Sequence, residues 1–368
     1  MSTWKFLSRS TRSCWSSIPD QAVRLLPLLL LGSQSCEEGG RVTPEGEITA
    51  NVAFGTVVSQ AGGTIRTEIF VAPLDGRVRR VSIAASCFCQ SPSISPDGKY
   101  VVYQSCDPRT SPGEPHELFV ATADGSRRWN ITNNSFVDER PLWGPAGDQV
   151  AFESDREGMQ DIYLTDWMGT SVRKVTGSLR ASRLGNWSPD GSRLVYSSLV
   201  PDPGGTTWQI FVVDVMGGGE RQLTWGEESS SDPVFSPGGD SIAYLQGSRL
   251  SVMGSLGGGQ REILSGVDSV TGPLEWSLNG EFIFCTGYSR GRSDIYRVRL
   301  DGSDPLNMTR VDHPGSHPAV LYDGQRIAYV ADLTAKKRIY LMELDGFGKH
   351  PLSPLNVEEF SPVARRPE

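Results

Sequence analysis

The chain has 368 residues, of which 21% are charged and 38% hydrophobic, and a formal net charge of −8 at pH 7. Its length suffices for one large core or a ring of small ones, and the acidic balance argues against a general nucleic-acid binder, which would show a basic face. Glycine and proline supply 41 and 24 residues, well above their usual joint share of roughly 12%, which indicates many tight turns.

The N-terminal residues differ in kind from the rest of the chain. Four basic residues precede an apolar run over residues 25–31, and small residues follow at 32–35. The basic residues are Lys5, Arg9, Arg12 and Arg24. This order describes a secretory signal rather than a membrane span, which needs about 20 apolar residues. We therefore expect a leader over residues 1–36, a linker over 37–50, and export of the protein.

Cys36 directly follows the small residues of this leader and resembles the lipid-bearing cysteine of a bacterial lipoprotein processing site. Such sites usually have Leu three residues before the cysteine, where this chain has Ser33. Two alternatives stay open: a lipid anchor on Cys36, or export without lipid to the periplasm. A translation start at Val23 would leave a compact lipoprotein leader.

The first predicted strands lie at residues 52–54 and 69–71, and a turn at Asp75-Gly76 leads to another strand. From there a short pattern recurs, in which an apolar strand, most often ending in an aromatic residue, is followed by a tight turn of the type S-P-D-G. The copies lie at residues 95–98, 143–147, 187–191, 235–239, 276–280 and 321–324. In this turn Pro presets the first corner and Gly adopts the left-handed conformation that returns the chain as a hairpin.

The closing glycines of these turns are 49, 44, 48, 41 and 44 residues apart. A period in the mid-forties is typical of a four-stranded propeller blade, whereas paired helices repeat at about 34. Each turn is followed by a second strand that ends in an aromatic residue, then a third strand, a glycine turn and a fourth strand. The second strands end at Tyr103, Phe152, Tyr196, Tyr244, Phe284 and Tyr329.

The two ends of the chain complement each other. Residues 52–76 supply the second, third and fourth strands of a blade that lacks a first strand, and residues 359–362 supply a first strand with nothing after it. Pairing them, with Phe360 beside Phe54, predicts an all-β, seven-bladed propeller over residues 51–365, closed by strands from both termini. The alternative is a native turn at residues 43–46, and a six-bladed count also stays open.

The S-P-D-G turn, the loop at residues 154–158 and the strand at 161–164 resemble TolB-type propeller repeats, a WD-like family. The resemblance covers about residues 52–362. It implies an exported bacterial protein that binds a partner in the envelope. TolB itself has a separate α/β domain and six blades, for which this sequence has no room, and this puts a role in the Tol system in doubt.

Two motifs suggest chemistry. Gly287-Tyr288-Ser289-Arg290-Gly291 fits the G-x-S-x-G pattern of serine hydrolases, but that pattern requires a strand-to-helix elbow, and Ser289 falls in a predicted blade loop. His313 and His317 lie close together, and oligogalacturonate lyases are similar propellers that use His and Gln as metal ligands. The sequence shows no third ligand at fixed spacing, so solvated loop histidines are the alternative.

The cysteines of the blades offer too few ligands for a zinc site. In an oxidising compartment Cys87 or Cys89 would form a disulfide with Cys106, with Cys89 and Cys106 as the candidate pair; the alternative is a set of free buried thiols.

The loops that enter each first strand vary from blade to blade and lie at one rim of the channel, where binding residues are expected. These residues are Gln90, Asp138, Glu139, Arg140, Arg183, Asn186, Asp232, His317 and Glu359. Their mixed charge indicates a polar partner, a protein segment or a glycan. Arg156 and Asp161 are expected to brace the blade by side-chain pairing.

The sequence therefore predicts a monomeric, non-enzymatic binding propeller of the bacterial envelope without a cofactor. Its partner would be a protein or a glycan and not a nucleic acid, and it would contact the membrane only through a lipid anchor. The alternative is a metal-dependent polysaccharide lyase-type propeller enzyme.

Overall fold

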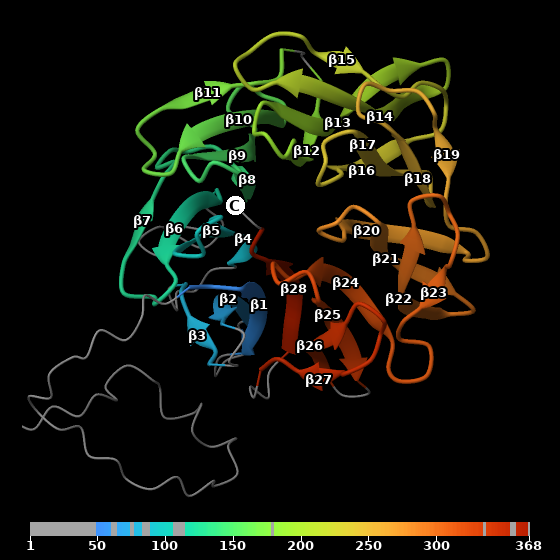
Figure 1. Cartoon of the computed structure of the whole chain (residues 1–368). Helices are drawn as coiled ribbons and strands as arrows, with labels where there is room; N and C mark the ends of the chain where they lie inside the picture. Colours follow the sequence, from blue (N-terminus) through green and yellow to red (C-terminus); the bar gives the residue numbers. More distant parts are fainter. Residues whose placement is uncertain are drawn as a thin grey trace, which may run out of the picture.

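The computed structural model describes residues 49–59, 65–73, 77–82, 89–105, 115–177, 180–333, 336–353 and 358–366. These residues form seven four-stranded antiparallel sheets, which stand as blades around a central axis (Figure 1). The predicted seven-bladed propeller is confirmed. The described part of the chain contains no helix, and hence none with the length and apolar character needed to cross a membrane.

Each blade is a meander whose first strand lies innermost. The composite blade consists of β28 (Glu358–Ala364), β1 (Val52–Ser59), β2 (Ile65–Ala72) and β3 (Arg79–Arg80). The next three blades are β4 (Gln90–Ile94), β5 (Tyr100–Ser105), β6 (Glu117–Thr122) and β7 (Arg128–Asn130); β8 (Asp138–Trp143), β9 (Gln149–Ser154), β10 (Asp161–Asp166) and β11 (Val172–Lys174); β12 (Ser182–Trp187), β13 (Arg193–Asp202), β14 (Gly205–Asp214) and β15 (Arg221–Gln222). The last three are β16 (Ser230–Phe235), β17 (Ser241–Gln246), β18 (Arg249–Gly254) and β19 (Arg261–Glu262); β20 (Ser269–Trp276), β21 (Phe282–Ser289), β22 (Arg292–Arg299) and β23 (Leu306–Asn307); β24 (Gly315–Val320), β25 (Arg326–Leu333), β26 (Lys336–Glu343) and β27 (His350–Pro351).

Strands from both termini close the ring, as the sequence predicts. The C-terminal β28 pairs antiparallel with β1, so that Phe360 lies opposite Gly55 and Val363 opposite Ala53. Gly55 is required here because a Cβ at this position would lie 2.4 Å from the Phe360 ring. The closure leaves no first-strand edge of this blade unpaired, which removes a site for edge-to-edge association. The alternative turn at residues 43–46 lies outside the described residues.

The recurring turn residues act as their chemistry predicts. In all six copies the amide of the closing glycine donates to the carbonyl three residues earlier, as from Gly98 to Ser95 at 2.8 Å. The hydroxyl of Ser95 also accepts from the Tyr100 amide at 3.0 Å, and Ser188 accepts from Arg193 at 2.9 Å. The serine therefore ties the first strand of the blade to the second.

The core lies between neighbouring blades. One aromatic residue from the second strand of each blade is fully buried, and these seven are among the largest such side chains described. They are Phe54, Tyr103, Phe152, Tyr196, Tyr244, Phe284 and Tyr329. Tyr196, for example, packs with Ile162 of the preceding blade. Each blade is thus stabilised by burial against its two neighbours.

The alternating strand directions give the ring two distinct ends. First strands begin at one end, here called the loop end, and finish at the S-P-D-G turns, here called the turn end. Third strands also finish at the turn end, since the Val215 amide donates to the Ser192 carbonyl at 2.8 Å and the Ser255 amide to Asp240 at 2.8 Å. The third-to-fourth strand turns of these blades therefore lie beside the S-P-D-G turns.

Candidate functional site

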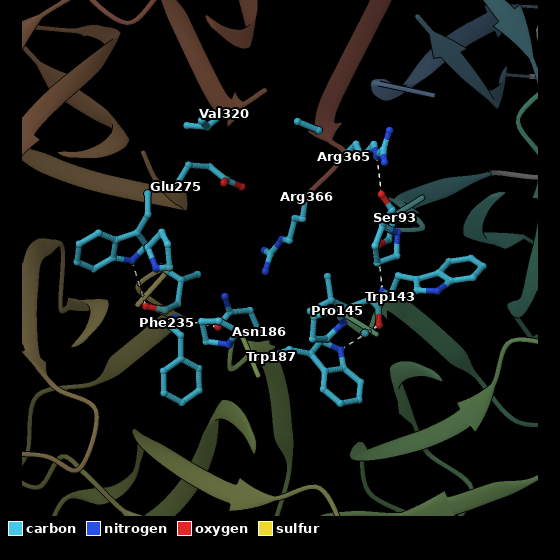
Figure 2. Close-up of a pocket in the computed structure, with 18 of the residues that line it drawn as sticks. Ser93, Trp143, Pro145, Asn186, Trp187, Phe235, Glu275, Val320, Arg365 and Arg366 are labelled. Atoms are coloured by element: carbon cyan, nitrogen blue, oxygen red, sulfur yellow. Dashed lines mark hydrogen bonds between the residues drawn. The ribbon is translucent and has the colours of Figure 1, made fainter. Parts of the chain in front are cut away.

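A cavity of about 510 Å³ occupies the axis at the turn end of the ring. All seven blades contribute to it, through the last residues of their first strands and the turns that follow (Figure 2). The lining residues that are exposed to solvent include Ala146, Pro189, Asp190 and Pro237, all of which belong to these turns. The cavity therefore opens at the turn end.

Buried aromatic side chains make the wall rigid. Trp143, Trp187, Phe235 and Trp276 are each 4–6% exposed and pack between blades. The indole N–H of Trp187 donates to the Leu142 carbonyl at 3.2 Å and that of Trp276 to Val234 at 3.3 Å. These bonds link neighbouring first strands, so the wall of the cavity is fixed by the same contacts that hold the ring.

Polar side chains in the wall are used within the fold. The Ser93 hydroxyl accepts from the Trp143 amide at 3.0 Å, and the Asn186 carbonyl oxygen accepts from the Phe235 amide at 2.8 Å. Both bonds cross from one blade to the next. These two side chains position the first strands.

The charged groups at the mouth are also engaged. Asp190 accepts hydrogen bonds from Ser188 and from the amide and hydroxyl of Ser192, and these bonds hold its pKa at about 2. The Arg365 guanidinium donates to the Pro96 carbonyl and lies over the Tyr322 ring at 5.0 Å. Both charged groups therefore stabilise the structure of the cavity mouth.

Glu275 and Arg366 differ from these groups. Figure 2 shows both side chains directed into the cavity, Glu275 from the end of β20 and Arg366 from the segment after β28. Within the described residues the Glu275 carboxylate has no hydrogen-bond or ion-pair partner, and burial raises its pKa to about 7, with Arg366 opposing the shift. A carboxylate of this kind is a candidate for ligand contact.

Except for Asn186, the residues predicted from the variable loops lie at or near the loop end, and several of their charged groups have partners inside the blades. Asp138 is fully buried and forms an ion pair with Arg156 at 2.8 Å, while Asn134 donates to its other oxygen at 2.6 Å. The pairing expected of Arg156 is thus present, and Asp161 likewise pairs with Lys174 at 2.7 Å.

Glu139 and Arg140 show the same behaviour. Glu139 accepts a hydrogen bond from Gln160, and Arg140 lies 3.4 Å from Glu153. Glu153 also accepts from the Leu184 amide at 2.7 Å in the next blade. Burial raises the pKa of Glu153 to about 7 even though it has these partners.

The other predicted residues are spread around the ring. The Arg183 guanidinium lies 4.5 Å from the centre of the Trp208 ring, and Glu359 is buried and accepts from the Ile339 amide at 2.7 Å. Gln90 is partly buried at the start of β4, and Asp232 is exposed. Of the residues named from the loops, Asn186 alone lines the turn-end cavity.

The two histidines have separate surroundings. The His313 ring packs against Tyr329 and Tyr340, with centroids 6.0 and 4.8 Å away, and burial lowers its pKa. His317 lies in the bulge of β24, and its Nδ1 is 3.1 Å from the Ser316 hydroxyl. Over the described ranges, no group of three or more His, Cys, Asp or Glu side chains is arranged to hold a metal ion.

Ser289 ends β21 and lies opposite Arg292 in the β21–β22 hairpin. The sequence prediction placed Ser289 in the loop between second and third strands, whereas it is the last strand residue before the turn at 290–291. The strand β22, and not the helix that a nucleophile elbow needs, follows this turn. Cys89 is buried with its sulfur 3.3 Å from the Ser105 hydroxyl. Cys106, its predicted disulfide partner, lies outside the described residues, as does the lipidation candidate Cys36.

Sequence reasoning missed Glu275 and Arg366. The signal for Glu275 was the next-to-last residue of each first strand. The other blades have Ser93, Leu142, Asn186, Val234, Ala319 and Val363 at this position. Aligning that column would have shown a single charged residue.

Comparisons with known proteins agree with the fold. The family model of the TolB beta propeller domain matches residues 43–266, more than half of the chain. An uncharacterized protein of Agrobacterium fabrum is 23% identical over 296 residues, which cover 77% of this chain and 83% of that protein. A protein TolB homolog of Chlorobium luteolum is 30% identical over 155 residues, 42% of this chain, and the match spans only 33% of that protein.

Among solved structures, an oligogalacturonate lyase in complex with manganese is similar with a TM-score of 0.59 at 14% identity. The match covers 83% of this chain and 86% of the lyase. At this level of identity the likeness concerns the fold alone, because one fold carries many functions.

Proposed function

The chain belongs to the TolB beta-propeller family, and on that premise we propose that it is a non-enzymatic binding propeller of the bacterial cell envelope. It holds a segment of a partner protein in the turn-end cavity. The observation that carries the proposal is the cavity itself, formed by all seven blades around the axis. Its volume of about 510 Å³ lies within the range of roughly 300–1,000 Å³ typical of ligand sites.

The composition of the cavity supports binding rather than catalysis. Its walls are built mainly from Pro, Trp, Leu and Val side chains, with few polar groups free to act on a substrate. Ligand sites combine such apolar walls with a small number of orienting polar groups. A rigid wall also limits the entropy that is lost when a partner segment is bound.

Exposed apolar side chains in the outer turns of the turn end support a protein partner. Met216 is 90% exposed and Phe347 is 72% exposed, and both lie in third-to-fourth strand turns at the turn end. Met168 and Leu256 occupy the same turns in two other blades and are at least half exposed. Methionine and aromatic residues are enriched in protein–protein interfaces, so these turns offer apolar contacts to a protein partner that extends beyond the cavity.

The predicted leader supports a proposal for the cellular location of the protein. A basic region and a short apolar run precede the propeller, which supports export. We propose that the protein acts in the periplasm or on the outer membrane as a monomer, attached through Cys36 where that cysteine carries a lipid.

The test is a quantitative pull-down from envelope extract with an Ala146→Trp variant. Ala146 is exposed at the mouth, so a Trp there obstructs the cavity without entering the core. We expect recovery of the partner to fall at least tenfold. The matched control carries Glu139→Ala and Arg183→Ala at the loop end, and it should recover the partner as the unmodified protein does.

Two results would contradict the proposal. Loss of the partner in the loop-end control, with full recovery by Ala146→Trp, would assign binding to the loop end instead. Bound metal that disappears in a His313→Ala, His317→Ala variant, together with activity on uronate polymers, would favour the lyase-type enzyme.

A further inference from the structure

Glu275 occupies a position at which no other blade has a charge. It precedes Trp276, whose partner across the β20–β21 pair is Ile283, and the equivalent residues elsewhere are small, amide or aliphatic. At this position the side chains of Ser93 and Asn186 each accept a hydrogen bond from a backbone amide of the next blade. No such bond is made by Glu275 in the described part of the chain, so its carboxylate does not serve the ring in that way.

The surroundings of Glu275 make an unpaired carboxylate unfavourable. It lies in a cavity walled by Leu274, Trp276 and Val320, and removing a carboxylate from water costs free energy unless a donor or cation compensates. Its pKa of about 7 reflects this burial. A ligand that brings a cationic donor to the carboxylate would supply the missing compensation and gain a charge-assisted hydrogen bond.

The other charged groups that line the cavity do not provide a cationic partner for the Glu275 carboxylate. Asp190 is satisfied by its own turn, and Arg365 is held by Pro96 and Tyr322. Arg366 is exposed and forms no ion pair with Glu275. It lies close enough to lower the pKa of the carboxyl group, but it leaves the oxygens of Glu275 open to a second cation.

We propose that Glu275 recognises a basic side chain, Lys or Arg, of the protein segment that enters the turn-end cavity. The inference rests on the proposed function and makes it specific: the partner presents a cation flanked by apolar residues. The aliphatic stem of Lys or Arg packs along the apolar wall while its charged end reaches the carboxylate. Arg366 acts against this cation by like-charge repulsion and therefore limits the affinity.

The test uses three tripeptides with blocked ends, acetyl-Ala-Arg-Ala-amide, acetyl-Ala-Gln-Ala-amide and acetyl-Ala-Glu-Ala-amide. Their binding to the full chain is measured by calorimetry at pH 8.5, where Glu275 is ionised. We expect the arginine peptide to bind at least tenfold more tightly than the other two. Glu275→Gln should remove this preference and leave the affinity for the glutamine peptide unchanged.

Two further measurements separate recognition from a structural effect. Arg366→Ala should increase the affinity for the arginine peptide severalfold at pH 8.5, the opposite direction to Glu275→Gln. Lowering the pH through about 7 should reduce the affinity of the unmodified protein for the arginine peptide. Its affinity for the glutamine peptide should stay the same. Thermal unfolding of both variants verifies that the ring is intact.

Equal affinity of the three peptides, no measurable binding of the arginine peptide, or a preference for the glutamate peptide would each overturn the inference. The pull-down with Ala146→Trp distinguishes this outcome from failure of the proposed function. If that variant loses the partner while Glu275→Gln keeps its full affinity, the cavity is the binding site and Glu275 is not its recognition group.

Discussion

The two ends of the ring use charge in opposite ways. At the loop end Asp138 meets Arg156 at 2.8 Å and Glu153 meets Arg140 at 3.4 Å, so the charges are consumed by contacts within and between blades. At the turn end Glu275 projects into a cavity without a partner among the described residues. The loop-end charges therefore stabilise the fold, whereas at the turn end, where Asp190 and Arg365 are also engaged, Glu275 remains available for a ligand.

Glu153 and Glu275 show why a raised pKa alone does not identify the site. Burial raises both pKa values to about 7. Glu153, however, accepts an amide hydrogen bond from Leu184 and contacts Arg140. The partners, and not the pKa, distinguish a side chain that braces the fold from one that is free to bind.

The largest expected effect is on stability at the loop end. Arg156→Ala leaves the fully buried Asp138 without its cation and removes the guanidinium that lies over Tyr163 at 4.6 Å. We expect the free energy of unfolding to fall by about 3 kcal/mol, as measured by urea denaturation. The matched control is Arg173→Ala, an exposed change on β11 of the same blade, which should alter stability by less than about 0.5 kcal/mol.

Partner recovery sharpens this prediction. Arg156→Ala should bind the partner normally at temperatures where it is folded. A loss of partner binding by Arg156→Ala without a loss of stability would contradict the claim that loop-end charges stabilise the fold and do not bind the partner.

A smaller effect of opposite sign is expected at the turn end. The carboxyl group of Glu275 has an ordinary pKa of 4.5 and a pKa of about 7 in the fold, so between these pH values the folded protein holds a proton that the unfolded chain has released. Glu275 therefore lowers the stability as the pH rises through this window. Glu275→Gln does not titrate and should raise the free energy of unfolding by on the order of 1 kcal/mol at pH 8.

Urea denaturation at pH 4.5 and pH 8 measures this difference. At pH 4.5 the carboxyl group is largely protonated in the fold, and most of the gain should vanish. A variant that is less stable than the unmodified protein at pH 8 would show that the Glu275 carboxylate serves the fold.

The repeat made most of the fold predictable. The spacing of Gly98, Gly147 and the later glycines fixed the size of the blade, and the strands left over at both ends predicted the pairing of β28 with β1. The blade size is predictable because turn chemistry and strand alternation depend on local sequence. The closure is predictable because a blade that lacks its first strand leaves a sheet edge unpaired until another segment of the chain supplies that strand.

The candidate site was less accessible from the sequence. Asp138 and Arg156 are 18 residues apart, and only the folded blade shows that they neutralise each other. Arg366 reaches the cavity because β28 joins a blade begun by residues more than 300 positions earlier. Which charges are paired depends on contacts between strands, and a pattern of single residues does not contain them.

The smallest expected effect concerns the exposed apolar turns. Met216→Ser should change the free energy of unfolding by less than about 0.5 kcal/mol, because the side chain is 90% exposed. We expect Met216→Ser to reduce the affinity for the partner by a few fold, as measured by titration of the captured complex. The control is Met159→Ser, because Met159 is a half-exposed methionine in the β9–β10 loop at the loop end. Equal effects of the two changes on partner affinity would contradict the assignment of binding to the turn end.

The central claim, that the turn end is the binding face, is tested most directly by site-specific photo-crosslinking in cells. The photoreactive amino acid p-benzoylphenylalanine is placed at position 146 at the mouth of the cavity, or at position 183 at the loop end. The account predicts a crosslinked partner from position 146 and none from position 183. Crosslinks from position 183 alone would contradict it.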